Sequence, residues 1–267
     1  MTLLIAWIGV DEKKDGKSVA SLYIAADSRY SWGNTGNYDY GVKIFGSVKY
    51  PDIFGFCGDV LFPSIVFGQL LPQIDSGLIF DDSDNCNTKH SKIYEYIKTS
   101  LEGYPKYQMA ESFTILHGTR KDKTFKCFKI TYNKHEGLKN EEIDLPNYST
   151  KICSAGSGKT EFDKNFLYWE NKKHNNYRTS RAVFHCLNET LKNIEDIGTG
   201  GKPQIIGLYR IDNSKIFGII ENGEKYVLGK KCFDHTNLTN IEWRNHNFER
   251  IDSETLTLIE GAQRQPK

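Results

Sequence analysis

The sequence carries little excess charge and no long run of apolar residues. Its 267 residues include 35 Lys and Arg against 34 Asp and Glu, which gives a formal net charge of +1. Nucleic acids and anionic membranes are bound through a basic face, so this balance predicts neither as a partner. The longest apolar stretch, residues 3–10, is far shorter than the ~20 residues that span a bilayer. No Lys or Arg precedes this stretch, as a secretory signal would require.

Closely spaced metal or disulfide ligands are also absent from the sequence. The histidines show no His-Glu-x-x-His spacing, and the cysteines form no Cys-x-x-Cys pair; they are Cys57, Cys86, Cys127, Cys153, Cys186 and Cys232. Zinc sites and disulfide-rich domains depend on close spacings, so we expect free thiols in a reducing compartment. The sequence therefore predicts a cytoplasmic globular protein without a metal site.

Strand and helix patterns occur in separate blocks along the chain. Apolar and β-branched segments predict strands over 2–10, 19–26, 42–48 and 53–57, and helical spacing follows over 61–74 and 90–101. Further strands (112–118, 124–132, 150–155), two helices (160–169, 179–194) and closing strands (203–211, 215–220, 225–228) complete the order. Such blocks favour an α+β layered fold in a single domain over 1–267. Residues 81–88 predict a surface insertion, and the polar segment 221–267 is an extension without an assigned structure.

Thr2 is the first residue with a distinctive chemistry. Methionine aminopeptidases remove Met1 when the next side chain is small, and removal would leave a free α-amino group on Thr2. An α-amine titrates near pH ~7.7–8.0, so it acts as a base at neutral pH. A Thr hydroxyl becomes a nucleophile when such a base takes its proton. A chain that keeps Met1 has a blocked amine and cannot act in this way.

Five short strings place Thr2 in a wider pattern. They are IAADSR at 24–29, VKI at 42–44, FGFCGD at 54–59, SAGSG at 154–158 and DIGTGG at 196–201. In this order, and with the predicted strands and helices around them, they resemble the proteasome β-subunit and HslV-like family of N-terminal-nucleophile hydrolases. The resemblance covers roughly residues 2–220. It implies a four-layer αββα sandwich and a threonine-type peptidase that needs no metal or organic cofactor.

The resemblance also implies roles for individual residues. Thr2 would be the nucleophile, Lys43 the ammonium beside it, and Asp27 the carboxylate that keeps this lysine charged. Gly58 would donate its backbone N–H to the oxyanion. A polar set would orient the terminal amine and relay protons, and it consists of Ser157, Asp196 and Thr199.

Residues of the substrate pocket follow from the same resemblance. They are Tyr30, Phe45, Phe56 and Val60, an apolar and aromatic lining that predicts a preference for apolar or small side chains before the cleaved bond. Two features depart from the family. Asp59 replaces a small residue that often follows the oxyanion glycine, and Thr199 stands where Ser is usual.

Other interpretations remain open at this point. Asp27 and Arg29 would form a surface ion pair, Lys43 would point outward, and Ser157 would cap a helix. The string GSGKT at 156–160 is similar to the end of a nucleotide-binding P-loop, but Cys153 occupies the position of its first glycine. A catalytically silent proteasome-like subunit with a structural or partner-binding role is the main alternative. For the enzyme, the resemblance implies protein or peptide substrates, a homo-oligomeric ring, and an ATPase or other regulator as a further partner.

Overall fold

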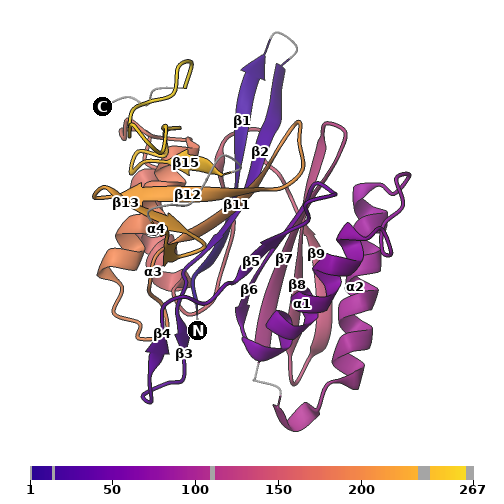
Figure 1. Cartoon of the computed structure of the whole chain (residues 1–267). Helices are drawn as coiled ribbons and strands as arrows, with labels where there is room; N and C mark the ends of the chain where they lie inside the picture. The colour runs from indigo at the N-terminus through magenta and orange to yellow at the C-terminus, as the bar shows by residue number, and fades with distance from the viewer. Residues whose placement is uncertain (1, 14–15, 109–111, 234–240, 263–267) are drawn as a thin grey trace.

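A computed structural model describes residues 2–13, 16–108, 112–233 and 241–262, and Figure 1 shows its elements. The strands of the larger sheet are β1 (Leu4–Lys13), β2 (Gly16–Ala26), β10 (Thr150–Ala155), β11 (Gln204–Tyr209), β12 (Lys215–Glu221), β13 (Glu224–Val227), β14 (Lys230–Lys231) and β15 (Glu242–Arg244). Their order is β10-β1-β2-β11-β12-β13-β14, with β15 paired in parallel to β12. The smaller sheet has the sequential order β5 (Ile44–Gly46), β6 (Asp52–Gly58), β7 (Ser112–Lys121), β8 (Thr124–Asn133) and β9 (Gly137–Ile143). The short strands β3 (Tyr30–Ser31) and β4 (Asn37–Tyr38) pair only with each other.

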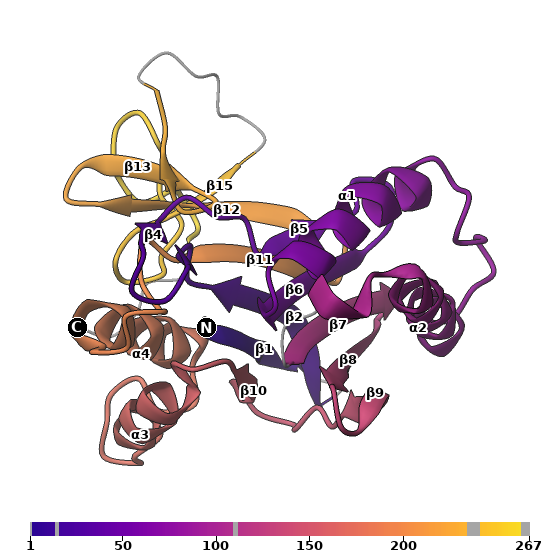
Figure 2. The same ribbon diagram turned by 90° about the horizontal axis from the view of Figure 1, so that it is seen from below.

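Helices cover the outer face of each sheet. The helices α1 (Leu61–Asp75) and α2 (Cys86–Gly103) lie on the smaller sheet, whereas α3 (Lys159–Trp169) and α4 (Ser180–Asn193) lie on the larger one, as Figures 1 and 2 show. The layers therefore run helices, sheet, sheet, helices, which confirms the predicted α+β sandwich. Within the described ranges, no helix is both long and apolar enough to cross a membrane.

Side-chain alternation along β1 explains how one strand serves two cores. Successive side chains of a strand point to opposite faces. The odd-numbered side chains from residue 3 to residue 7 pack toward α3 and α4, and the even-numbered ones from 4 to 8 pack between the two sheets. Both faces are buried, so the sequence of this strand is continuously apolar.

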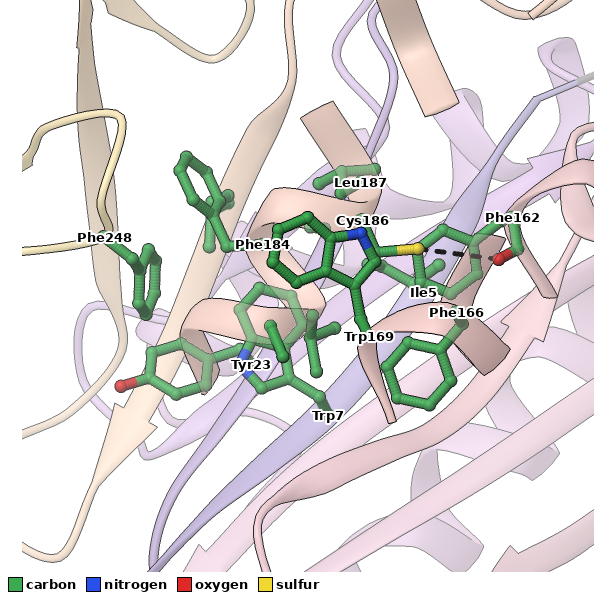
Figure 3. Packing of buried hydrophobic residues seen from close by; sticks show 14 of the residues in the cluster. Ile5, Trp7, Tyr23, Phe162, Phe166, Trp169, Phe184, Cys186, Leu187 and Phe248 are labelled. Atoms are coloured by element: carbon green, nitrogen blue, oxygen red, sulfur yellow. Dashed lines mark hydrogen bonds between the residues drawn. The ribbon is translucent and has the colours of Figure 1, made fainter. Parts of the chain in front are cut away.

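Aromatic rings fill the core between the larger sheet and its helices. Trp7 stacks on Tyr23 with ring centroids 4.8 Å apart, and Phe248 from the C-terminal segment packs edge-on against both rings (Figure 3). On the helix side, Cys186 Sγ donates to the carbonyl oxygen of Phe162 at 3.5 Å. These contacts tie α3, α4 and the C-terminal segment to β1.

The segment after residue 220 adds the short strands β13, β14 and β15 to the larger sheet. Trp243 is buried and lies in β15 next to Gly218 of β12, and Ile251 is buried beside it. The strand predicted over 225–228 is observed as β13, and the prediction had left the rest of this segment as an extension without an assigned structure. Strand β15 pairs with β12, which is not its neighbour in the sequence, so the polar sequence around β15 gives little indication that a strand forms there.

Two further elements differ from the sequence prediction. Helix α2 begins at Cys86, inside the predicted insertion, because the Asn85 side chain caps it by accepting from Thr88 N. Strand β9 was not predicted because it is a largely exposed edge strand rich in Lys and Glu. Lys126 and Lys129 of β8 form ion pairs with Glu142 and Glu141 of β9.

Candidate active site

Thr2 and Lys43 meet where the two sheets face each other. Thr2 lies just before β1 and is fully buried, and its Oγ1 accepts a hydrogen bond from Lys43 Nζ at 2.8 Å. Lys43 precedes β5 of the smaller sheet and is also fully buried. A buried ammonium group at this distance stabilises an alkoxide more than a neutral hydroxyl. The alternative of an outward-pointing Lys43 is therefore wrong.

Asp27 holds Lys43 from the end of β2. Its Oδ1 accepts from Lys43 Nζ at 2.8 Å and from Leu3 N at 2.9 Å. Its Oδ2 accepts from the backbone N–H groups of Arg29 at 3.1 Å and Gly200 at 3.0 Å. Burial raises the pKa of Asp27, and the charge and hydrogen bond of Lys43 oppose that effect. Burial likewise lowers the pKa of Lys43, with Asp27 acting in the opposite direction.

A cluster of polar side chains lies next to the main-chain nitrogen of Thr2. Thr2 N donates to Ser157 Oγ at 3.2 Å, and Ser157 Oγ in turn donates to Asp196 Oδ2. Thr199 Oγ1 donates to the same carboxylate oxygen at 2.7 Å. Burial acts to raise the pKa of Asp196, but hydrogen bonds led by that from Ser157 bring it below its ordinary value. Ser157 does not cap α3, whose N-cap is Gly158 without a side-chain hydrogen bond.

Gly58, the predicted oxyanion donor, ends β6 at a position that only glycine can occupy without strain. Its φ is 93°, and an added Cβ would lie 2.5 Å from Ser112 O. Phe56 N donates to Lys43 O at 3.0 Å. Backbone N–H groups two residues apart point to the same strand edge, so the Gly58 N–H faces the side on which Lys43 lies. The neighbouring Asp59 accepts from Phe62 N at 2.9 Å and caps the first turn of α1, which explains an acidic residue at this position.

The predicted pocket residues do not all lie in one place. Tyr30 is half-buried, with its hydroxyl donating to Val42 O at 2.6 Å and its ring centroid 5.8 Å from Lys43 Nζ. The half-buried residue Val60 directly precedes α1. Phe56 is 0 % exposed and belongs to the core beneath α1 and α2.

Phe45 is half-buried and packs against that same core, with its ring stacked on Phe67 at 5.0 Å. Phe56 is a core side chain and so lines no open pocket, which corrects its predicted role. The half-buried residues Tyr30, Phe45 and Val60 remain candidates for that role.

Three residues around the site were not in the predicted set. Arg29 pairs with Asp39 at 2.6 Å instead of forming the surface pair with Asp27, and its Nη1 donates to Thr199 O at 3.5 Å. Gly200 supplies an N–H to Asp27. Gly156 has a φ of 91°, and an added Cβ would lie 2.0 Å from Thr2 O. Both glycines lie inside the quoted strings, which is the signal that marks them.

The structure is unlike a P-loop. Strand β10 pairs antiparallel with β1 at the edge of the larger sheet, whereas a P-loop normally opens a parallel sheet. Lys159 forms an ion pair with Asp163 of its own helix. These findings remove the nucleotide-binding alternative. No group of three or more His, Cys, Asp and Glu side chains in the described part of the chain could hold a metal ion.

A large cavity lies away from these residues. It measures about 930 Å³ and is lined by residues at the far end of β1, such as Gly9 and Asp11, together with Arg178 and Tyr209. Thr2 is at the opposite end of β1 and does not line it. The cavity is therefore separate from the candidate site.

Solved structures of Anbu proteins share this fold. A Gly-1 mutant of Anbu from Hyphomicrobium sp. strain MC1 aligns with a TM-score of 0.52 and 10% identity over 86% of this chain and 87% of that chain. Anbu from Yersinia bercovieri, described as an ancestral beta-subunit, aligns with a TM-score of 0.52 and 9% identity over 87% of this chain and 88% of that chain. A chain of the helical Anbu assembly from Pseudomonas aeruginosa aligns with a TM-score of 0.51 and 9% identity over 88% of each chain. No family model and no curated protein matches the sequence. The likeness shows the predicted four-layer αββα sandwich.

Proposed function

We propose that the chain is a threonine-type hydrolase that cleaves amide bonds through Thr2 once Met1 has been removed. Met1 itself lies outside the described residues. The observation that carries the proposal is the hydrogen bond from the buried Lys43 ammonium to Thr2 Oγ1, with Asp27 as the counter-ion. A silent subunit has no physical need to bury this charged pair beside a hydroxyl, because burial of both ions is costly.

The proposed reaction uses groups of the chain alone. The free Thr2 amine takes the proton of Oγ1, and Oγ1 attacks the carbonyl carbon of the substrate. The oxyanion that forms is stabilised by the Gly58 N–H. The C–N bond then breaks, the leaving amine receives the proton, and water hydrolyses the Thr2 ester. Ser157 contacts the Thr2 nitrogen and so orients the base.

Intact mass before and after treatment with an epoxyketone tests the proposal. We expect a species that lacks Met1 and gains one inhibitor mass, and no gain in Thr2→Ala. A matched control is Thr35→Ala, which changes an exposed threonine of the β3–β4 hairpin and should label like the wild type. Lys43→Ala should abolish turnover of a fluorogenic peptide in a folded protein. A chain that keeps Met1 and gains no mass would instead favour the silent subunit.

Cleavage preference and assembly are further parts of the proposal. Tyr30 and Val60 support cleavage after apolar or small side chains, and a peptide library cut best after Asp, Glu, Lys or Arg would contradict this. We also propose a homo-oligomer in a reducing cytoplasm. The free cysteines and the assembled Anbu complex from Pseudomonas aeruginosa support these two parts. Light scattering after size-exclusion chromatography measures the assembly, and a monomeric mass would contradict it.

A further inference from the structure

One buried glutamine joins the backbone segments that carry Asp27 and Lys43. Gln204 is the first residue of β11 and is 0 % exposed. Its Oε1 accepts from Lys43 N at 3.0 Å, and its Nε2 donates to Asp27 O at 3.1 Å and to Gly41 O at 2.8 Å. We propose that Gln204 is a positioning residue for the Lys43–Asp27 pair. This role rests on the proposed function.

The chemistry of the partners fixes the orientation of this amide. A backbone N–H is only a donor, and backbone carbonyls are only acceptors. The oxygen of Gln204 must therefore face Lys43 N, and its nitrogen must face Asp27 O and Gly41 O. Among the standard side chains of this size, only Gln presents an acceptor and two donors in this arrangement.

Lys43 depends on this contact because its backbone lies outside the strand ladder. Strand β5 begins at Ile44, one residue later. Lys43 O is paired with Phe56 N of the smaller sheet, whereas Lys43 N is paired with a side chain of the larger sheet. A buried N–H without a partner is destabilising, so losing Gln204 favours a shift of this segment.

A small shift here matters for the reaction. Lys43 Nζ has to remain 2.8 Å from both Thr2 Oγ1 and Asp27 Oδ1, although these atoms belong to the other sheet. Gln204 links the two sheets beside this contact. Misplacement of a reacting group by about 1 Å lowers rates by roughly 10²-fold. Gln204 touches none of the reacting atoms, so its effect is on position.

Two variants separate positioning from general stability. Gln204→Leu keeps a similar volume and removes all three hydrogen bonds. Gln204→Glu retains an acceptor for Lys43 N but places a second oxygen against two carbonyls, where only the protonated acid can donate. The matched controls are Gln69→Leu and Gln69→Glu, at an exposed position of α1.

The first measurement is turnover of a peptide by the full chain. We expect Gln204→Leu to lower kcat by roughly 10²-fold with KM within about twofold, because the substrate contacts remain. The activity of Gln204→Glu relative to wild type should rise as the pH falls, because protonation restores a donor. Gln69 variants should match the wild type. An unchanged kcat in folded Gln204→Leu, or a ratio independent of pH in Gln204→Glu, would overturn the proposal.

The second measurement does not need activity. Amide hydrogen exchange by NMR should show Lys43 N–H exchanging at least about tenfold faster in Gln204→Leu, which removes the acceptor of this N–H, while Phe56 N–H stays protected. Equal protection of Lys43 in the variant and the wild type would overturn the proposal. Absence of turnover in the wild type would count against the proposed function, and exchange would still decide whether Gln204 holds Lys43. If Gln204→Leu does not fold, Gln204→Met, which also lacks the acceptor, takes its place in the exchange measurement, and Gln204→Glu still provides the pH-dependent activity readout.

Discussion

Replacing Asp27 by Asn tests the electrostatic argument for the site. Both oxygens of Asp27 accept from two donors each, and the side chain is 0 % exposed. An Asn in its place turns one acceptor into a donor that faces two donors. It also leaves the Lys43 ammonium buried without its counter-ion, so Lys43 is expected to lose its proton or to rearrange.

The expected loss of stability is large for a substitution of this size. Breaking a buried ion pair by removing one partner costs about 3–5 kcal/mol. For a chain of this length, each kcal/mol lowers Tm by roughly 2–4 °C, so we expect a decrease of roughly 6–20 °C. The matched control is Asp81→Asn, whose carboxylate is exposed and pairs with Lys92 at 2.7 Å. Exposed pairs contribute less than about 1 kcal/mol.

Urea unfolding at pH 7, followed by the fluorescence of the tryptophans, of which Trp7 is fully buried, measures the free energy of unfolding of both variants. The double variant Asp27→Asn/Lys43→Met removes both charges and should recover most of the lost stability, because the buried ammonium is then absent. If the free energy of unfolding of Asp27→Asn lies within about 1 kcal/mol of the wild-type value, the inference that Asp27 balances the buried charge of Lys43 is refuted.

Two further predictions concern the ion pairs between α3 and β10 and a glycine beside Thr2. Burial acts to raise the pKa of Asp163, but hydrogen bonds led by that from Lys151 lower it to about 2 from an ordinary 3.8. This group therefore stabilises the protein above pH ~4, and its contribution is lost as the pH falls toward 2. Asp163→Asn should flatten the acid limb of a Tm-against-pH curve, and an unchanged limb would contradict the assignment. Gly156→Ala should cost about 1–3 kcal/mol from the positive φ alone. It should also reduce epoxyketone labelling, since the added Cβ lies 2.0 Å from Thr2 O; labelling at the wild-type rate would contradict this.

Local signals predicted several elements closely. The helix predicted over 160–169 is observed as Lys159–Trp169, and that over 179–194 as Ser180–Asn193 with Thr179 as its N-cap. Amphipathic spacing and a capping residue are properties of the segment itself. Strand β15 was missed because its partner β12 is not its neighbour in the sequence. Strand β9 pairs with the adjacent β8 and was missed because its exposed, charged sequence shows no apolar alternation.

In the candidate site, too, residues marked by the local sequence were predicted, and residues that depend on distant contacts were not. Thr2, Lys43 and Asp27 were found through strings that resemble a known family. Phe56 was assigned to the pocket by its position in the resembling family, and that position does not tell which face of the strand its side chain occupies; in the structure it lies in the core beneath α1 and α2. Gln204 had no local signal at all, because its three partners lie on segments more than 160 positions away in sequence.

The connection between Thr2 and Gly200 through Asp27 has a consequence for the order in which this part of the molecule forms during folding. Thr2 precedes β1 and Asp27 follows β2, whereas the loop from Asp196 to Gly200 lies far later in the sequence, just before β11. Until that loop docks, Thr2 N lacks the Asp196 and Thr199 side of its network, and Asp27 lacks the Gly200 N–H. Pairing of β1 with β2 alone therefore leaves the polar network around Thr2 incomplete, and the docking of β11 with the loop before it completes the network.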